Sequence, residues 1–118
     1  MLRTMLKSKI HRATVTEACV DYQGSISIDS DLLDAADILE YEQVQIYNVS
    51  NGERFATYVI RGEAGSGVIC LNGAAARKVA KDDLIIIASY VMVDEEKTRG
   101  WRPTCILLDG NNKIKRAD

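Results

Sequence analysis

The chain has 118 residues, of which 47% are hydrophobic and 27% are charged, and its formal net charge is −2. This balance is typical of one globular domain with a hydrophobic core, and it excludes the strongly basic surface that nucleic acids or anionic membranes attract. No apolar run approaches the roughly 20 residues of a membrane-spanning helix, and the N-terminus lacks the apolar core of a secretion signal. We therefore expect a single cytoplasmic domain over residues 1–118.

Most of the chain consists of short runs in which apolar and β-branched residues favour β-strands. In chain order these runs are 3–16, 25–29, 42–49, 54–60, 67–71, 84–93 and 104–108. Asn51-Gly52 predicts a type I′ hairpin turn between the third and fourth runs. The run 84–93 is apolar on both faces, which predicts a strand through the centre of the core. The basic residues 112–118 are expected to form a solvated tail.

Helical signals are sparse. The best one covers residues 29–39, where Asp29 or Ser30 can cap the helix and apolar residues recur at helical spacing. A shorter turn is expected after Gly73, over residues 74–80. Many short strands with few helices favour a closed or nearly closed small β-barrel.

The sequence also excludes several kinds of catalytic site. His11 is the one histidine, and no C-x-x-C motif occurs, so a metal cluster is not expected. The three cysteines are interpreted as buried small hydrophobic residues. Residues 61–69, "RGEAGSGVI", fit no phosphate-binding motif and are interpreted as a flexible loop. If the protein is an enzyme, its electrophile must come from a cofactor or from the chain itself.

Several longer stretches resemble one known family. "TMLKSKIHRATVTEA", "YQGSISID", "NGERFATY", "LNGAAARKVAKDDLIIIASY" and "WRPTCILLDGNN" are similar to sequences of the pyruvoyl-dependent aspartate 1-decarboxylases. The similarity covers essentially the whole chain. Gly24-Ser25 is specific because of its position among these stretches, whereas the second Gly-Ser pair, Gly65-Ser66, lacks that setting.

The resemblance implies a mainly β fold, a small six-stranded double-psi β-barrel with one or two short helices, assembled as a homotetramer with active sites between subunits. It implies that L-aspartate becomes β-alanine and CO₂ through a Schiff base, for pantothenate and coenzyme A synthesis. The chain would cut itself into residues 1–24 and 25–118, alone or with an accessory maturation protein. Ser25 would become a covalent pyruvoyl group, with neither a metal nor pyridoxal phosphate.

The resemblance also assigns residues to the cleavage step. The Ser25 hydroxyl would attack the carbonyl of Gly24, which can adopt a strained conformation and leaves room for the attack. The Thr57 hydroxyl is our choice of donor to the oxyanion that forms at Gly24. Asn72 would support the geometry of the cleavage site.

Turnover would use a further set of side chains. Arg54 and Lys9 are expected to bind the two substrate carboxylates, since guanidinium pairs bidentately with carboxylate. Tyr58 matches the family's proton donor, which protonates the carbanion after CO₂ leaves. Expected substrate contacts also include Thr57 and the turn residues Gly73, Ala74 and Ala75.

Two alternatives stay open at this point. One is a non-catalytic β-barrel binding or scaffold module with an uncut chain, and the other is a pyruvoyl decarboxylase for another small amino acid. His11 is interpreted as a structural hydrogen-bonding residue near the site. Tyr22 lines the pocket or packs against it, and Tyr47 stands where some family members carry tryptophan.

Overall fold

Nine β-strands form one sheet in the computed structural model, which describes residues 1–118. The strands are β1 (Leu2–Thr14), β2 (Glu17–Cys19), β3 (Ser25–Asp29), β4 (Gln43–Asn48), β5 (Arg54–Gly62), β6 (Ile69–Asn72), β7 (Leu84–Asp94), β8 (Thr104–Leu108) and β9 (Ile114–Ala117). Helical structure is limited to α1 (Ser30–Ala36) and two 3₁₀ turns, η1 (Gly73–Lys78) and η2 (Glu95–Lys97). The expected mainly β fold with few short helices is confirmed.

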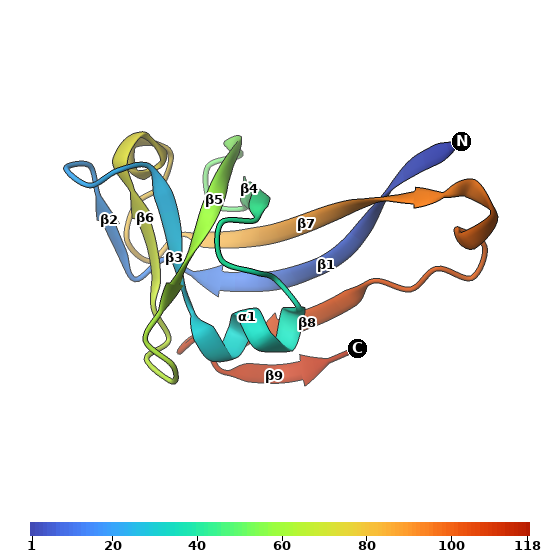
Figure 1. The fold of residues 1–118 in the computed structure, drawn as a ribbon. Helices are drawn as coiled ribbons and strands as arrows, with labels where there is room; N and C mark the ends of the chain where they lie inside the picture. The colour runs from blue at the N-terminus through green and yellow to red at the C-terminus, as the bar shows by residue number, and fades with distance from the viewer.

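The sheet has the strand order β2-β6-β3-β5-β4-β7-β1-β8-β9, nine strands rather than the expected six, with β2 and β9 at its two ends (Figure 1). Most neighbours are antiparallel. Three pairs are parallel, namely β1 with β8, β2 with β6, and β3 with β5. The strand β3 therefore has a parallel neighbour on one side and an antiparallel one, β6, on the other.

The core is a cluster of 20 buried hydrophobic residues, to which most strands and α1 contribute. In several strands alternate residues face it, as Val44 and Ile46 of β4 and Ile85 and Ile87 of β7 do. Removing one such side chain from water stabilises the fold by about 1.5–3 kcal/mol. This shared core fixes β3 and its neighbours, which carry the residues discussed below.

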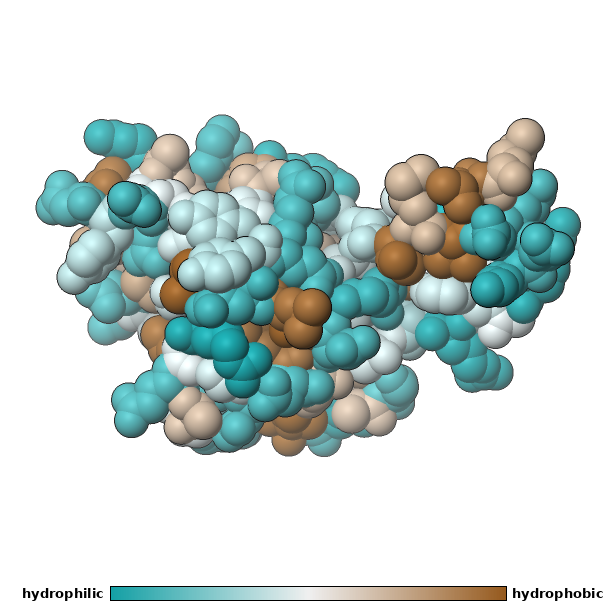
Figure 2. Space-filling model, viewed as in Figure 1, coloured by the Kyte–Doolittle hydropathy of each residue, from teal (hydrophilic) through white to brown (hydrophobic).

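The paired strands β1 and β7 extend beyond this core as an arm that carries the N-terminus at its far end (Figure 1). On the arm, Tyr90 and Met92 are exposed, as are Met1 and Leu2. Figure 2 shows the corresponding hydrophobic colour gathered on this projecting part. The expectation that all of residues 84–93 cross the core is therefore correct only for the first half of β7.

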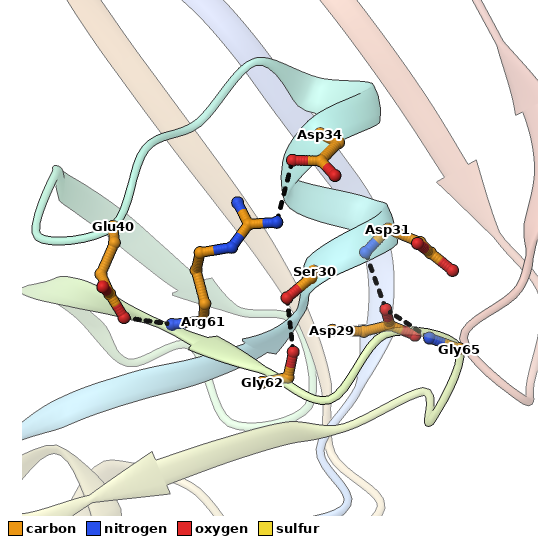
Figure 3. Close-up of polar contacts among 8 residues, drawn as sticks. All are labelled: Asp29, Ser30, Asp31, Asp34, Glu40, Arg61, Gly62 and Gly65. Atoms are coloured by element: carbon orange, nitrogen blue, oxygen red, sulfur yellow. Dashed lines mark hydrogen bonds and ion pairs between the residues drawn. The ribbon is translucent and has the colours of Figure 1, made fainter.

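The helix α1 begins at a buried carboxylate (Figure 3). Asp29 is 2% exposed and accepts hydrogen bonds from the backbone N–H of Asp31 at 2.9 Å, Gly65 at 3.0 Å and Gly67 at 2.8 Å. Burial alone would raise the pKa of this carboxyl, but the three N–H donors and Lys113 outweigh it and hold the pKa below the ordinary value. The loop around Gly65 is thus bonded to the residue that caps the helix, and the two ends of the stretch interpreted as a loop belong to β5 and β6.

The same helix is shorter than expected at its other end. Asp37 adopts a left-handed backbone conformation with φ of 56°, which stops the helix after Ala36. Ile38 is still buried, so this apolar residue packs in the core without belonging to the helix. Around α1, Arg61 pairs with Asp34 and its backbone N–H donates to Glu40, while Ser30 donates to the Gly62 carbonyl (Figure 3).

The hairpin of β4 and β5 is confirmed, but its turn is not the expected type I′ turn. The Asn48 N–H donates to the Glu53 carbonyl at 2.8 Å, so residues 49–52 lie between the paired ends. Gly52 has a φ of 80°, whereas Asn51 does not have the positive φ that a type I′ turn requires at both central positions. The Asn51 side chain instead accepts from the Glu53 N–H at 2.8 Å and closes the wider loop.

Two strands were not expected. The end of the chain, interpreted as a solvated tail, forms the exposed strand β9 on β8, and β2 pairs over only three residues with β6. None of the helices has the length and apolar character needed to cross a bilayer.

Candidate active site

Gly24-Ser25 lies where an exposed loop enters the sheet. Residues 20–23 are exposed, and Ser25, the first residue of β3, is only 4% exposed. A Cβ atom placed on Gly24 would meet nothing closer than the Asn72 carbonyl oxygen at 3.9 Å. The peptide bond between the two residues therefore has free space on its glycine side and a fixed strand on its serine side.

Asn72 holds the Ser25 side chain. The two residues face each other across the antiparallel pair of β3 and β6, and the Asn72 Nδ2 donates to Ser25 Oγ at 2.9 Å. Ser25 Oγ is also 3.4 Å from the Gln23 carbonyl oxygen, to which it can donate. Asn72 is 7% exposed, so this contact is shielded from water.

Two cavities flank the Gly24-Ser25 bond. One, of about 530 Å³, is lined by residues that include Ser25, Asn72, Tyr58, Tyr22 and Cys70. The other, of about 380 Å³, is lined by residues that include Gly24, Thr57, Tyr58, Ala74 and Ala75. Tyr58 belongs to both walls.

Simple strand alternation would send Thr57 and Tyr58 to opposite faces. Both nevertheless line the smaller cavity beside Gly24, and Tyr58 also lines the larger one. The structure thus brings both residues to the expected cleavage site within one chain.

Gly73 lies directly against the loop that precedes Ser25. Its φ is 64°, and a Cβ on it would come within 2.5 Å of the Gly24 nitrogen and 2.7 Å of the Tyr22 carbonyl oxygen. Only glycine tolerates both the backbone conformation and this close approach. Gly73 therefore shapes the loop before Ser25, while Ala74 and Ala75 line the cavity.

Lys9 lies in a different place. It is on β1, which is separated from β3 by β5, β4 and β7 in the strand order. Lys9 lines a cavity of about 510 Å³ together with His11, Arg12, Arg116 and other residues. No cavity of the chain is lined by both Lys9 and Ser25.

His11 does not make the expected structural hydrogen bond through Nδ1, which is buried without a partner. Burial, followed by the charges of Lys9 and Arg12, lowers the pKa of His11. The cavity beside His11 thus carries the positive charges of Lys9, Arg12 and Arg116 and the negative charge of Asp118, which pairs with Arg116 at 3.4 Å.

Arg54 is exposed at the start of β5, and its guanidinium carbon lies 4.0 Å from the centroid of the Tyr47 ring. The hydroxyl of Tyr47 is 2.7 Å from that of Tyr90. This hydrogen bond, with burial, raises the pKa of Tyr90. Tyr47 thus packs against the arginine and is itself bonded to Tyr90 of β7, and Tyr90 was not expected there.

Sequence reasoning also missed Ser27 and Cys70, which lie beside Asn72. The available signal was their even spacing from Ser25 and Asn72 on two strands. This spacing shows that the four side chains share a face only once the register of β3 and β6 is known. No group of three or more His, Cys, Asp or Glu side chains is placed to hold a metal ion.

A small β-sheet protein with a buried serine held by an amide, and a phenol across an open cavity, has the features of an enzyme. The model of the family described as aspartate decarboxylase matches residues 1–115. The chain belongs to this family.

Curated relatives agree along nearly the whole length. The aspartate 1-decarboxylase of Syntrophus aciditrophicus is 70% identical over 115 residues, which are 98% of this chain and 99% of that protein. The aspartate 1-decarboxylase of Pelotomaculum thermopropionicum is 60% identical over 97% of this chain and 86% of its own length. That of Neisseria meningitidis is 60% identical over 98% and 91%.

Proposed function

We propose that this protein is an aspartate 1-decarboxylase, which converts L-aspartate to β-alanine and CO₂. The family match over residues 1–115 and the relatives of that name support the activity. The observation that carries the proposal is the buried Ser25 hydroxyl, held by Asn72 at 2.9 Å directly after Gly24, where an added Cβ would meet nothing closer than 3.9 Å. A non-catalytic scaffold would not need this arrangement.

The first reaction is a cut in the chain itself, giving residues 1–24 and 25–118. Ser25 Oγ bonds to the Gly24 carbonyl carbon while the bond from that carbon to the Ser25 nitrogen breaks, and the hydroxyl proton passes to the nitrogen. The resulting ester then loses the Ser25 Cα proton, and the Cβ–Oγ bond breaks, so that Gly24 leaves as a carboxylate. The Cβ atom then takes up a proton, water adds to the Cα atom, the nitrogen leaves as ammonia, and a ketone remains at residue 25.

The residues around Ser25 fit such a group. The start of β3 is fixed on both sides by β5 and β6, and it opens into a cavity of about 530 Å³. A covalent pyruvoyl group would supply the electron-accepting carbonyl that amino acid decarboxylation requires, in the role that bound pyridoxal phosphate has in other enzymes.

The chain's own side chains then bind substrate and move protons. The Tyr58 phenol, on the wall of both cavities, donates a proton to the carbon that CO₂ leaves. Thr57 donates to the oxyanion at Gly24 during cleavage and contacts the substrate afterwards, with Gly73, Ala74 and Ala75 beside it. Arg54 and Lys9 bind the substrate carboxylates.

We place the complete site between subunits of a homotetramer. Lys9 and Ser25 lie in separate cavities of one chain, so a second copy would have to bring a lysine to each Ser25. The exposed apolar residues of the β1–β7 arm, Met1, Leu2 and Met92, supply surface for such contacts. We further propose that six of the strands form a double-psi barrel, which the parallel pairs β1–β8 and β3–β5 support.

Intact-mass measurement of the purified protein tests the proposal. We expect two masses, those of residues 1–24 and of residues 25–118, the larger with a ketone at its N-terminus. We also expect the protein to release CO₂ from aspartate. Ser25→Ala should abolish both cleavage and activity, because no hydroxyl remains to attack Gly24.

The chain offers a matched control in its second Gly-Ser pair. Ser66→Ala at Gly65-Ser66 should leave cleavage and turnover unchanged, since Ser66 is exposed and its hydroxyl donates to the Glu63 carbonyl. A wild-type chain that stays uncut after long incubation, with and without cell extract as a source of an accessory protein, would refute the self-processing enzyme.

A further inference from the structure

Four polar side chains share one face of the β3–β6 pair. In the antiparallel register Ser25 lies opposite Asn72, and Ser27 lies opposite Cys70. Because residues two apart on a strand point to the same side, all four side chains project together. All four line the cavity of about 530 Å³ beside the cleavage site.

Asn72 is at the centre of this group and uses both ends of its amide. Its Nδ2 donates to Ser25 Oγ at 2.9 Å and to Ser27 Oγ at 3.2 Å. Its Oδ1 accepts from Cys70 Sγ at 3.2 Å. The two serine hydroxyls can serve either orientation of the amide, since a hydroxyl both donates and accepts. The Cys70 sulfur distinguishes them, because it accepts only weakly: an NH₂ turned toward it would exchange the two serine oxygens for a poor acceptor, whereas Oδ1 can accept from the thiol.

We propose that Cys70 is a positioning residue for self-cleavage, whose thiol holds the Asn72 amide with its NH₂ directed at Ser25 Oγ. The inference rests on the proposed self-processing function. In this orientation the serine oxygen accepts a hydrogen bond, and its own proton is left free to depart. Rotation of the amide by 180° would instead present Asn72 Oδ1 to Ser25, where it would bind the hydroxyl proton that the acyl shift must move.

The same hydrogen bond assists the elimination step. When the Cβ–Oγ bond breaks, the electron pair stays on Oγ as part of the departing Gly24 carboxylate. An N–H group already directed at Oγ stabilises that developing charge.

The thiol is in the protonated form that this role requires. Burial, then the negative charge of Glu17 and the neighbouring Cys19, raises the pKa of Cys70 above its ordinary value of 9.0. Cys70 is 8% exposed, so the contact with Asn72 competes little with water. Cys19 lies on the adjacent strand β2 and makes no such bond, which provides a matched control.

The test compares four variants of the full chain by following cleavage with intact-mass measurement. Cys70→Ser keeps a donor for Asn72 Oδ1, but its hydroxyl also accepts and so allows both amide orientations; it should still cleave within about twofold of the wild-type rate. Cys70→Ala and Cys70→Val both remove the donor, and Val also fills the space. Both should cleave roughly tenfold more slowly, the size expected for one buried hydrogen bond. Cys19→Ala should match wild type.

Thermal unfolding of each variant separates positioning from packing. The proposal is supported if Cys70→Ala and Cys70→Val lose cleavage, Cys70→Ser keeps it, and all three variants have similar melting temperatures. Cleavage of Cys70→Val at the wild-type rate, or equal slowing of Ser, Ala and Val, overturns it. If wild type itself stays uncut, the proposed function fails with the inference. If wild type cuts and Val cuts equally fast, only the inference fails.

Discussion

Asp29 illustrates how much a single side chain contributes to this fold. Its carboxylate caps α1 and also binds two backbone N–H groups of the loop that contains Gly65 and Gly67. One residue thereby joins β3, the helix and a loop more than thirty positions away. The aspartate was expected as a helix cap, but the loop contacts depend on tertiary structure that no local pattern reveals.

We expect Asp29→Ala to lower the free energy of unfolding by about 3 kcal/mol, since it removes a helix cap and two further charge-assisted hydrogen bonds. Asp31→Ala, on the first turn of the same helix, should cost less than about 1 kcal/mol because that side chain is exposed. Denaturant titration measures both. Equal losses would contradict the role assigned to Asp29.

The pH dependence of Asp29 follows from the same contacts. Its pKa in the folded protein lies below the ordinary value of 3.8, so its contribution is present above pH 3.8 and is lost as the pH falls through the folded value. As the pH is lowered, the free energy of unfolding should fall less in Asp29→Asn than in wild type. Identical acid profiles would show that other carboxyls dominate.

At the scale of elements, the turn η1 and the loop before β3 interlock at one glycine. A Cβ on Gly73 would lie 2.5 Å from the Gly24 nitrogen, inside any tolerated contact distance. Gly73 was expected to contact substrate, together with Ala74 and Ala75. Its closeness to Gly24 adds a structural role that spacing alone did not indicate.

We expect Gly73→Ala to slow self-cleavage by at least tenfold, because the loop that carries Gly24 must shift. Gly52→Ala is the matched control, since Gly52 also has a positive φ, of 80°, but a Cβ there meets nothing within 4 Å. It should lose about 1 kcal/mol of stability and cleave normally. Intact mass and thermal unfolding measure the two effects. If Gly73→Ala and Gly52→Ala cleave at similar rates, Gly73 does not shape the cleavage site.

The elements themselves were predictable where side-chain periodicity was strong. The alternating residues of β3, β4 and β5 and the aspartate cap of α1 carried clear local signals. The strands β2 and β9 did not, because three residues or a fully exposed strand show no alternation of burial. The β4–β5 turn was misjudged because side-chain hydrogen bonds of Asn48 and Asn51 favour a wider loop than Asn-Gly alone predicts.

At the scale of the whole molecule, the candidate residues divide into two groups. The chain brings Thr57, Tyr58 and Asn72 to Gly24-Ser25, whereas Lys9 lines another cavity. The resemblance provided the residue identities, and only the three-dimensional arrangement shows which of them meet within one chain. This division leads to a prediction about assembly.

Ser25→Ala and Lys9→Ala chains should each be inactive alone, the first without a ketone and the second without a carboxylate partner. Co-expressed, they should regain activity, because some sites would combine a processed Ser25 with an intact Lys9 from the other chain. The same proteins assembled separately and then mixed serve as the control. Absence of recovery in verified mixed oligomers would place Lys9 and Ser25 of one chain in one site.

The pairing of the first two strands has a consequence for the refolding of a cut chain. Residues 1–24 contain β1, which bonds to β7 and β8, and β2, which bonds to β6. A cut after Gly24 therefore leaves strands of both pieces hydrogen-bonded in one sheet, and the pieces separate only when that sheet unfolds. Folding of the uncut chain is a unimolecular reaction, but regain of structure after the cut requires two molecules to meet. Dilution would then oppose refolding, and the cut protein would depend on never losing its structure.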